Sequence, residues 1–361
     1  MNLLEVAKRA NVSIATASRA INRVRTVDPR LAKRVWKVIE QVGYCPNTHA
    51  RRLASGRSRM FGLMVSEIIN PFFPEIAQTF EDLGVEHNYE ILLSPIAQDP
   101  RRIEAAAERM IERRVDGVAI LTFGNEESLI EVLRRRSVPV FAVDIDSPGP
   151  LLKTARIDYQ HGIREAVQHL AAMGHARIAF ISGPAHLKTA MARRVAFQEC
   201  MKEIGLPISP TVLVEGDHTM EAGMNAMSAL AALPDRPSAV VCSNDMTAIG
   251  VMREAYDLGL DVPRDLSVVG FDDIRLARFM TPPLTTVQMS QTEIATVAFR
   301  ALLDFVEARG NGSSREAYEI KTNLVLRRST ALGPHRLRET AAGQYEQRNA
   351  SAVGGTQREA S

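Results

Sequence analysis

The stretch Val12-Ser13-Ile14-Ala15-Thr16-Ala17-Ser18-Arg19 predicts a short helix that follows a tight turn. Ser13 is a good helix N-cap, because its hydroxyl can accept a hydrogen bond from a free backbone N–H. Asn11, in the preceding turn, tolerates left-handed backbone better than most residues. Ala17 and Ile21 are four residues apart and are expected to face inward. This pattern is typical of the second helix of a helix-turn-helix unit.

A further helix is predicted on each side of this stretch. Asn2 and Glu5 form an approximate capping box before the first helix, whose apolar face consists of Leu3, Val6, Ala7 and Ala10. Asp28-Pro29 is a cap followed by proline at the first helical position, which predicts the start of the third helix. Its inward stripe is expected to be Leu31, Val35, Val38 and Val42, with Trp36 packed partly against the same core. Residues 1–45 should therefore form a small all-α head.

The charges of the chain are divided unevenly between its two ends. Residues 1–60 hold 13 lysine and arginine residues against 3 acidic residues, a net charge of +10. The remaining residues hold 31 basic against 39 acidic side chains, a net charge of −8. A basic end on an acidic body is what phosphate contact by one end requires. A basic surface with no partner is the alternative, but the charge coincides with the helix-turn-helix pattern.

The second helix carries the residues expected to contact double-stranded DNA. If it enters the major groove, its outward residues Ile14, Ala15 and Arg19 meet base edges. Arg19 can pair bidentately with a guanine, and the two apolar side chains can contact a thymine methyl group. Phosphate contacts, which fix register but not sequence, suit Thr16, Ser18, Arg23 and Arg25.

Residues 46–58 are interpreted as a short hinge helix with its linker. Asn47 is a good N-cap and Gly56 a good stop. Isolated helices below about 12–15 residues are marginal in water, so this helix should be ordered only when it is docked. Leu53, an apolar side chain among basic ones, could wedge between base pairs from the minor groove. A plain interdomain linker is the alternative.

After Met60 the sequence alternates apolar strands with amphipathic helices. Strands are predicted at 61–65, 90–93, 117–121, 138–143, 177–181, 239–242 and 266–271, and crossover helices at 74–88, 100–114 and 126–136. The pattern restarts near residue 177, so residues 59–333 should form an α/β body of two parallel-sheet lobes. Such sheets bind ligands at the carboxyl ends of their strands.

Polar and aromatic residues gather where these strands end. The candidates for binding a small ligand are Asn70, Phe72, Phe73, Asp144, Arg193, Asn244 and Asp272. Carboxylates can accept from the hydroxyls of a polyhydroxylated ring, arginine can donate, and a phenyl ring can cover its apolar face. The alternative is that Asp and Asn act here only as helix caps and turn formers.

The head and the hinge segment resemble the lactose/galactose repressor family of bacterial transcription factors. The resemblance lies in Glu5-Val6-Ala7, Val12-Ser13, Thr16, Ser18-Arg19, Asn22, Gly43-Tyr44, Pro46-Asn47, Ala50-Arg51 and Leu53, and it continues to about residue 330. The chain departs from the usual residues at Asn11, Ala17 and His49. The stretch 282–287 also matches, but the usual basic-then-Gln continuation is replaced by Gln288-Met289.

This resemblance implies how the chain would work. It adds Ser13, Asn22, Asn47 and Ala50 to the expected DNA contacts, which already include Arg25. It also implies that the hinge helices of two subunits pair in the minor groove with Leu53 intercalated. It implies that the seven candidates bind an effector, in a body similar to periplasmic sugar-binding proteins. Leu187, where relatives place a charged residue, leaves the charge of that effector open.

Other classes of protein are disfavoured by missing patterns. No apolar run reaches the length of about 18 residues that a membrane span needs, and no signal-peptide pattern opens the chain. Cys45, Cys200 and Cys242 are too dispersed for a disulfide framework or a metal site, which favours the cytoplasm. No nucleotide-binding, hydrolase, zinc-protease or redox motif is present, so neither an enzyme nor a cofactor is expected.

We therefore expect a homodimeric, cytoplasmic transcription regulator, most simply a repressor, that binds operator DNA and is controlled by a small ligand. A sugar or sugar derivative is the favoured effector and a purine-type nucleobase the alternative. A sugar-binding protein without DNA function and a sugar-converting enzyme are the rival classes. Residues 334–361, which lack apolar periodicity and leucine heptads, are expected to be a disordered tail.

Overall fold

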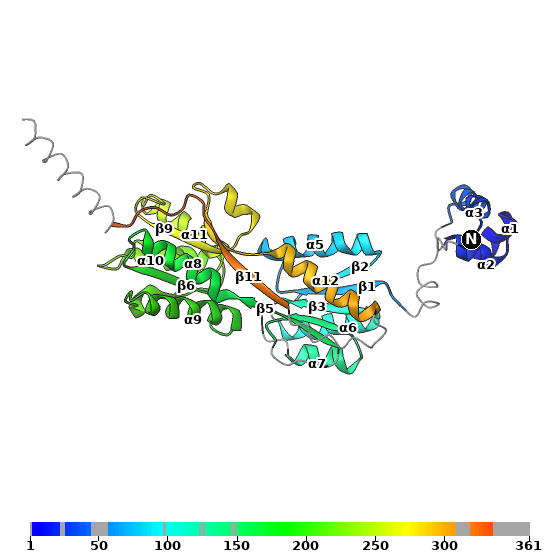
Figure 1. The fold of residues 1–361 in the computed structure, drawn as a ribbon, viewed down its shortest axis with the longest axis horizontal. Coiled ribbons are helices and arrows are strands. Elements are labelled where there is room, and N and C mark those ends of the chain that lie inside the picture. The colour runs from blue at the N-terminus through cyan, green and yellow to red at the C-terminus, as the bar shows by residue number, and fades with distance from the viewer. Residues whose placement is uncertain are drawn as a thin grey trace, which may run out of the picture. The chain divides into compact units, whose positions relative to one another are not determined.

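The computed structural model describes residues 2–21, 26–44, 57–96, 99–122, 124, 127–145, 149, 151–307 and 318–334. Its internal contacts divide the chain into two compact units, Met1–Ser58 and Arg59–Ser361, which we call the head and the body. Each is described by itself (Figure 1). The predicted hinge segment, from 46 to 56, and the predicted tail beyond residue 334 lie outside the described residues.

The head consists of α1 (Leu3–Arg9), α2 (Ile14–Ile21) and α3 (Pro29–Val42). The predicted start signals act as expected. The Asn2 side chain accepts from the Glu5 N–H at 3.0 Å, Ser13 Oγ accepts from the Thr16 N–H at 3.1 Å, and Asp28 accepts from the Arg30 N–H at 2.6 Å. Asn11 has a φ of 51°, the left-handed conformation expected in the turn. The all-α head is confirmed.

The head core differs from the prediction in one helix. Val35 and Ile39 of α3 are buried, whereas Val38 and Val42 only pack partly against the core, as does Trp36. Val35 and Ile39 are four residues apart and so lie on the same face of the helix. The predicted position, Val38, is one residue before Ile39 and therefore points to the side of that face. Arg34 donates from α3 to the carbonyl oxygens of Ala10 at 2.5 Å and Asn11 at 3.2 Å, which ties the turn to the third helix.

The first lobe of the body, the N-lobe, is built on parallel strands in the order β2-β1-β3-β4-β5. These strands are β1 (Met60–Val65), β2 (Glu90–Pro95), β3 (Gly117–Leu121), β4 (Val140–Val143) and β5 (Leu152–Asp158), with helices α5 (Phe72–His87), α6 (Pro100–Glu112) and α7 (Glu127–Arg135). The predicted strands and crossover helices of this lobe are present, and β5 is an addition. Lys153 and Arg156 interrupt its apolar pattern, which hid it from sequence reasoning.

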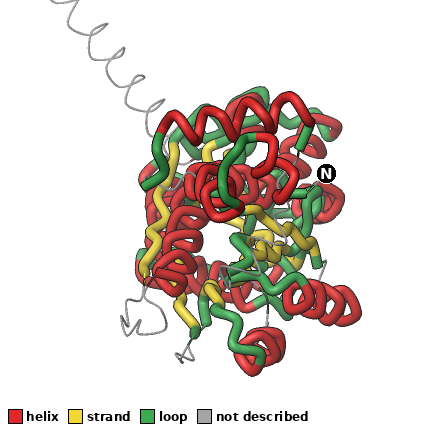
Figure 2. The backbone as a smooth tube through the Cα atoms, turned by 90° about the vertical axis from the view of Figure 1, so that its right-hand side faces the viewer, coloured by secondary structure: helices red, strands yellow, loops and turns green. Residues whose placement is uncertain are grey.

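The second lobe, the C-lobe, has parallel strands in the order β10-β9-β8-β6-β7. They are β6 (Ile178–Ser182), β7 (Leu213–Glu215), β8 (Ala239–Cys242), β9 (Ser267–Asp272) and β10 (Thr285–Met289). Its helices are α8 (Tyr159–Ala172), α9 (Lys188–Glu203), α10 (Met220–Ala231) and α11 (Asp245–Asp257), with the 3₁₀ turns η1 (Pro210–Val212) and η2 (Arg275–Phe279). Helices surround the strands of the body (Figure 2).

The chain passes between the lobes at three places, which we call the crossovers. The first joins β5 to α8, and the second joins β10 to α12 (Gln291–Glu307), which packs on α5 and β3 of the N-lobe. The third is β11 (Tyr318–Val325), which pairs in parallel with β5 and antiparallel with β10 (Figure 1). Two lobes are confirmed, but this antiparallel pair makes the sheets mixed, a difference from the prediction.

No helix among the described residues is both long enough and apolar enough to cross a bilayer.

Candidate functional sites

The outward surface of α2 holds the residues predicted to read DNA. Ile14, Ala15 and Arg19 are exposed, and Ile14 keeps 49% of its side-chain surface in solvent. Thr16 and Ser18 are half-buried, while Ala17 packs into the core behind them. An exposed apolar side chain at a helix N-terminus, followed by an exposed arginine, leaves both groups available to a partner.

Two of the predicted DNA-contacting side chains, Ser13 and Thr16, already have a structural role. Ser13 caps α2, and its hydroxyl lies 2.9 Å from the Thr16 hydroxyl. The other predicted DNA contacts, Asn22, Arg23, Arg25, Asn47, Ala50 and Leu53, lie outside the described residues.

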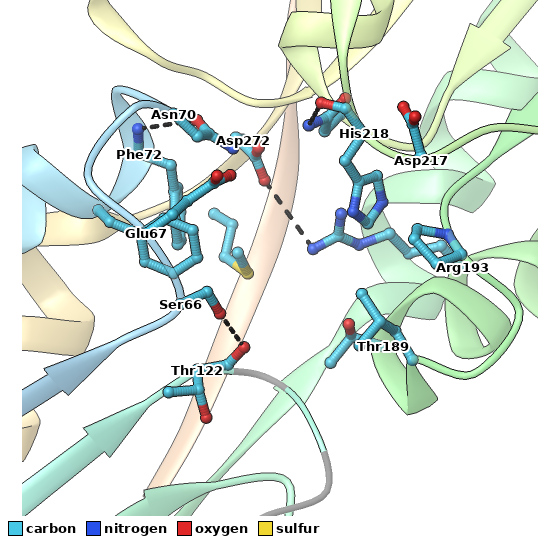
Figure 3. Close-up of a pocket in the computed structure, with 15 residues that line it drawn as sticks. Ser66, Glu67, Asn70, Phe72, Thr122, Thr189, Arg193, Asp217, His218 and Asp272 are labelled. Carbon is cyan, nitrogen blue, oxygen red and sulfur yellow. Dashed lines mark hydrogen bonds and ion pairs between the residues drawn. The ribbon is translucent and has the colours of Figure 1, made fainter. Parts of the chain in front are cut away.

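A cavity of about 280 Å³ lies between the two lobes of the body, where their strands end (Figure 3). Its walls comprise Ser66, Glu67, Asn70, Phe72, Phe73 and Thr122 from the N-lobe, and Pro184, Leu187, Thr189, Arg193, Asp217, His218, Asn244, Asp272 and Met289 from the C-lobe. Six of the seven predicted effector residues line it, and Asp144 does not.

The N-lobe wall combines two aromatic side chains with polar and charged ones. The Asn70 side chain accepts from the Phe72 N–H at 3.1 Å and so holds the entry into α5. The rings of Phe72 and Phe73 pack edge to face with centroids 5.3 Å apart. Glu67 adds a carboxylate to this wall, and its partial burial raises the pKa of that carboxyl.

The C-lobe wall is dominated by the Arg193 guanidinium. It stacks on Phe271, with 4.0 Å between the guanidinium carbon and the ring centroid, and donates to the Ser243 carbonyl oxygen at 2.6 Å. Its nearest carboxylate is Asp272 at 3.9 Å, which is too long for a hydrogen bond. Arg193 and Asp272 are both buried, and the Nε of Arg193 has no hydrogen-bond partner within the described part of the chain.

Asp272 occupies an unusual position at the end of β9. Its φ of 114° is one that side-chain-bearing residues rarely adopt. Burial raises the pKa of its carboxyl to about 7, although the neighbouring Arg193 charge acts to lower it. Gln291 donates to the Asp272 carbonyl oxygen at 2.8 Å and helps hold this conformation. Near neutral pH this carboxyl can therefore either donate or accept a hydrogen bond.

His218 and Asn244 complete the C-lobe wall. Asn244 caps α11 by accepting from the Thr247 N–H at 2.9 Å, and its amide donates to the His218 carbonyl oxygen at 3.1 Å. His218 Nε2 lies 2.9 Å from Ser243 Oγ. Burial, together with the nearby Arg193 charge, lowers the pKa of His218 to about 3, although Asp217 acts to raise it. The imidazole is therefore neutral and can exchange hydrogen bonds without carrying charge.

Asp144 lies behind the cavity rather than in it. It accepts from the Ile157 N–H at 2.9 Å and from the Tyr159 hydroxyl at 2.7 Å. The Tyr159 ring in turn lies 5.2 Å from the Arg193 guanidinium carbon. Asp144 thus contacts Tyr159 and the backbone of β5 and does not line the cavity, which corrects its predicted placement.

Sequence reasoning missed several lining residues, chiefly Glu67, Thr189, Asp217 and His218. Each lies two to seven residues beyond the end of a strand, where the chain leaves the carboxyl edge of the sheet and enters the next helix. The strand that precedes Asp217 and His218 is β7, which has only three residues and no clear apolar run. Among the described residues no group of three or more His, Cys, Asp or Glu side chains could hold a metal ion.

Comparisons with known proteins agree with this architecture. Residues 2–47 match the family model described as bacterial regulatory proteins of the lacI family, and residues 167–330 match the periplasmic binding protein-like domain. Catabolite control protein A of Priestia megaterium is 34% identical over 332 residues, covering 91% of this chain and 99% of that protein. The HTH-type transcriptional repressor PurR of Erwinia tasmaniensis is 33% identical over 334 residues, covering 92% and 97%.

Solved structures give the same result. The lac repressor dimer bound to operator and the anti-inducer ONPF superposes with a TM-score of 0.81 at 25% identity, covering 92% of this chain and 99% of that one. The complex of the transcriptional regulator CelR with cellobiose has a TM-score of 0.69 at 28% identity, covering 91% and 99%. The chain therefore belongs to the lacI family of bacterial regulatory proteins and is a DNA-binding transcription regulator with a ligand-binding body.

Proposed function

We propose that the chain is a homodimeric repressor whose α2 helix reads operator DNA through Ile14, Ala15 and Arg19. The exposure of these three side chains supports this assignment. Two heads related by a two-fold axis would recognise a palindromic site, with phosphate contacts setting the register. The similar lac repressor structure is a dimer on its operator, which supports the same assembly here. Operator binding places the protein in the cytoplasm, where bacterial DNA lies.

The effector is a small polyhydroxylated molecule, a sugar or sugar derivative, bound between the lobes. The single observation that carries this is the buried Arg193–Asp272 pair, which faces the cavity at 3.9 Å without a direct hydrogen bond. A ligand hydroxyl can accept from the guanidinium and donate to the carboxylate, and so close this gap. Phe72 and Phe73 offer an apolar surface for the face of the ring.

The size of the cavity limits the ligand. Pockets for drug-sized molecules enclose about 300–1,000 Å³, and this one encloses about 280 Å³. A monosaccharide or a compound of that size is therefore favoured over a long oligosaccharide. The cellobiose complex of the similar CelR structure supports a carbohydrate, and the PurR relatives justify testing nucleobases beside sugars.

A catalytic role is not favoured, although a serine and a histidine do meet beside the cavity. Ser243 is fully buried, so its hydroxyl is not accessible to a substrate. His218 has its pKa lowered to about 3, chiefly by burial, so it is a poor general base at neutral pH. We therefore assign the pair to the wall of a binding site.

Two measurements test this function. Selection of duplexes from a random pool by the purified full chain should yield a palindromic sequence, bound in a salt-sensitive way. A thermal-shift screen of monosaccharides, sugar phosphates and purine bases should then show stabilisation by a member of the sugar set. Failure to select any sequence would reject the DNA-reading role, and stabilisation by purines alone would reject the sugar assignment.

A further inference from the structure

Two hydrogen bonds, one partly buried and one buried, link the charged pair of the cavity to two of the crossovers between the lobes. The first lies at the crossover from β5 to α8. There the Tyr159 hydroxyl, at the start of α8 in the C-lobe, donates to Asp144 Oδ2 at 2.7 Å. Asp144 follows β4 of the N-lobe and also accepts from the backbone of Ile157 in β5. This bond therefore ties the first helix of the C-lobe to the N-lobe sheet.

The same tyrosine reaches the cation of the cavity. Its ring centroid lies 5.2 Å from the Arg193 guanidinium carbon, which also stacks on Phe271. Arg193 thus packs against two aromatic rings whose centroids lie 6.1 Å apart, and Tyr159 is anchored by its hydroxyl to the opposite lobe. A change in the angle between the lobes would either break the bond to Asp144 or move the ring against Arg193.

The second bond lies at the crossover from β10 to α12. Gln291 is the first residue of α12, a helix that packs on α5 of the N-lobe. Its amide donates to the carbonyl oxygen of Asp272, the last residue of β9 in the C-lobe, at 2.8 Å. Both residues are buried, and Asp272 has the left-handed φ of 114° that its surroundings must hold.

We propose that Tyr159 and Gln291 are positioning residues that couple the Arg193–Asp272 pair to the angle between the lobes. This inference rests on the proposed function, in which a ligand binds that pair. Breaking either hydrogen bond leaves a polar group without its partner, so we expect each of these two crossovers to switch between two arrangements. A ligand that fixes Arg193 and Asp272 thereby favours one arrangement of both crossovers.

Tyr159→Phe and Gln291→Leu remove these two bonds with little change in side-chain size. Tyr159→Phe keeps the ring beside Arg193, so it isolates the hydroxyl. Gln288→Leu is the matched control, because Gln288 donates to Asp273 at 3.0 Å within the C-lobe and crosses no lobe boundary. All three variants are made in the full chain, and calorimetric unfolding verifies that each is folded.

Two readouts follow the coupling. The first is the dissociation constant for the duplex that the wild-type chain selects. In Tyr159→Phe and in Gln291→Leu this constant should rise or fall by about fivefold or more. Gln288→Leu should stay within about twofold. In the second, which needs no DNA, amide hydrogen exchange of the segments around Tyr159 and Asp272 should accelerate in the two crossover variants only.

A double-mutant cycle with Asp144→Leu completes the test. If Tyr159 acts through Asp144, the double variant should resemble Tyr159→Phe alone rather than the sum of both effects. The inference is overturned if neither crossover variant alters hydrogen exchange, or if Gln288→Leu alters both readouts as much as they do. Loss of duplex selection by the wild-type chain would instead reject the proposed function, and hydrogen exchange would still decide the inference.

Discussion

Arg19 of the head and Arg193 of the body present the same functional group in opposite settings. Arg19 extends from α2 into solvent and makes no ion pair or hydrogen bond within the described residues. Arg193 is buried, stacks on Phe271 and donates to the Ser243 carbonyl oxygen. An exposed arginine keeps its donors for a partner, whereas a buried one is already part of the fold. Changes at the two sites should therefore separate binding from stability.

The largest effect is expected for Arg193→Met. Removing the guanidinium leaves the buried Asp272 carboxylate without its cation, and breaking a buried pair costs about 3–5 kcal/mol. The free energy of unfolding, measured by urea denaturation at pH 8, should fall by this amount. Adding Asp272→Asn to the same chain removes the unpaired charge, so most of the lost free energy of unfolding should be regained. A double variant as unstable as Arg193→Met alone would contradict the pairing.

The next effect concerns the pH dependence of stability. The pKa of Asp272 is raised to about 7 by burial, so its contribution to stability is full at low pH and falls as the pH rises toward 7. The pKa of His218 is lowered to about 3, chiefly by burial, so its contribution falls as the pH decreases below the unfolded value of about 6.5. Between about pH 4 and 6.5 the two slopes, each about 1.4 kcal/mol per pH unit, oppose one another.

Single variants should expose these opposed slopes. Relative to the wild type, Asp272→Asn should gain stability as the pH rises from 4.5 to 6.5, and His218→Gln should gain stability as the pH falls over the same range. Urea denaturation at several pH values measures both differences. If the difference in free energy of unfolding between each variant and the wild type were the same at every pH, the pKa shifts assigned to burial would be refuted.

Arg19→Ala should show the reverse behaviour of Arg193→Met. Because the side chain is exposed, the free energy of unfolding should change by less than about 0.5 kcal/mol. Binding to the selected duplex should weaken by about 1–3 kcal/mol, with discrimination lost at one guanine. Fluorescence anisotropy with the selected duplex and with a duplex changed at that guanine measures the loss. An equal weakening for both duplexes would assign Arg19 to phosphate contact instead.

The smallest effect is expected for Ser13→Ala, which removes the N-cap of α2. Loss of such a cap costs about 1 kcal/mol, because the Thr16 N–H loses its acceptor. The unfolding transition of the head should shift while that of the body stays in place. Ser13→Asp, which can still accept from this N–H, serves as the control and should retain the stability of the head. If both variants destabilised the head equally, Ser13 would not act as a cap.

The head could be predicted almost completely, because its signals are local. The caps at Asn2, Ser13 and Asp28 each act within three residues along the chain, and the left-handed Asn11 lies in the turn where the pattern placed it. The exception is the buried face of α3, where Ile39 is buried instead of the predicted Val38. Local hydrogen bonds can be predicted from sequence without knowledge of the tertiary fold.

The pocket could be predicted only in part, because its geometry depends on distant segments. Residues at strand ends, such as Asn70 and Asp272, were found from the pattern of strands. Asp144 was placed wrongly in the cavity, because its bond to Tyr159 depends on how β4, β5 and α8 meet. Asn244 caps α11, and Asn70 holds the turn before α5 by accepting from the Phe72 N–H. Both also line the cavity, so the structural and the ligand-binding interpretations of these residues are compatible.

We propose that occupancy of the cavity in the body controls DNA binding by the head. A titration of the full chain onto its selected duplex, with and without the monosaccharide that gives the largest thermal shift, tests this control. In the wild type this ligand should change the dissociation constant by about tenfold or more. In Arg193→Met the change should be abolished while ligand-free binding persists. An unchanged dissociation constant in the wild type at saturating ligand would show that the cavity does not control DNA binding.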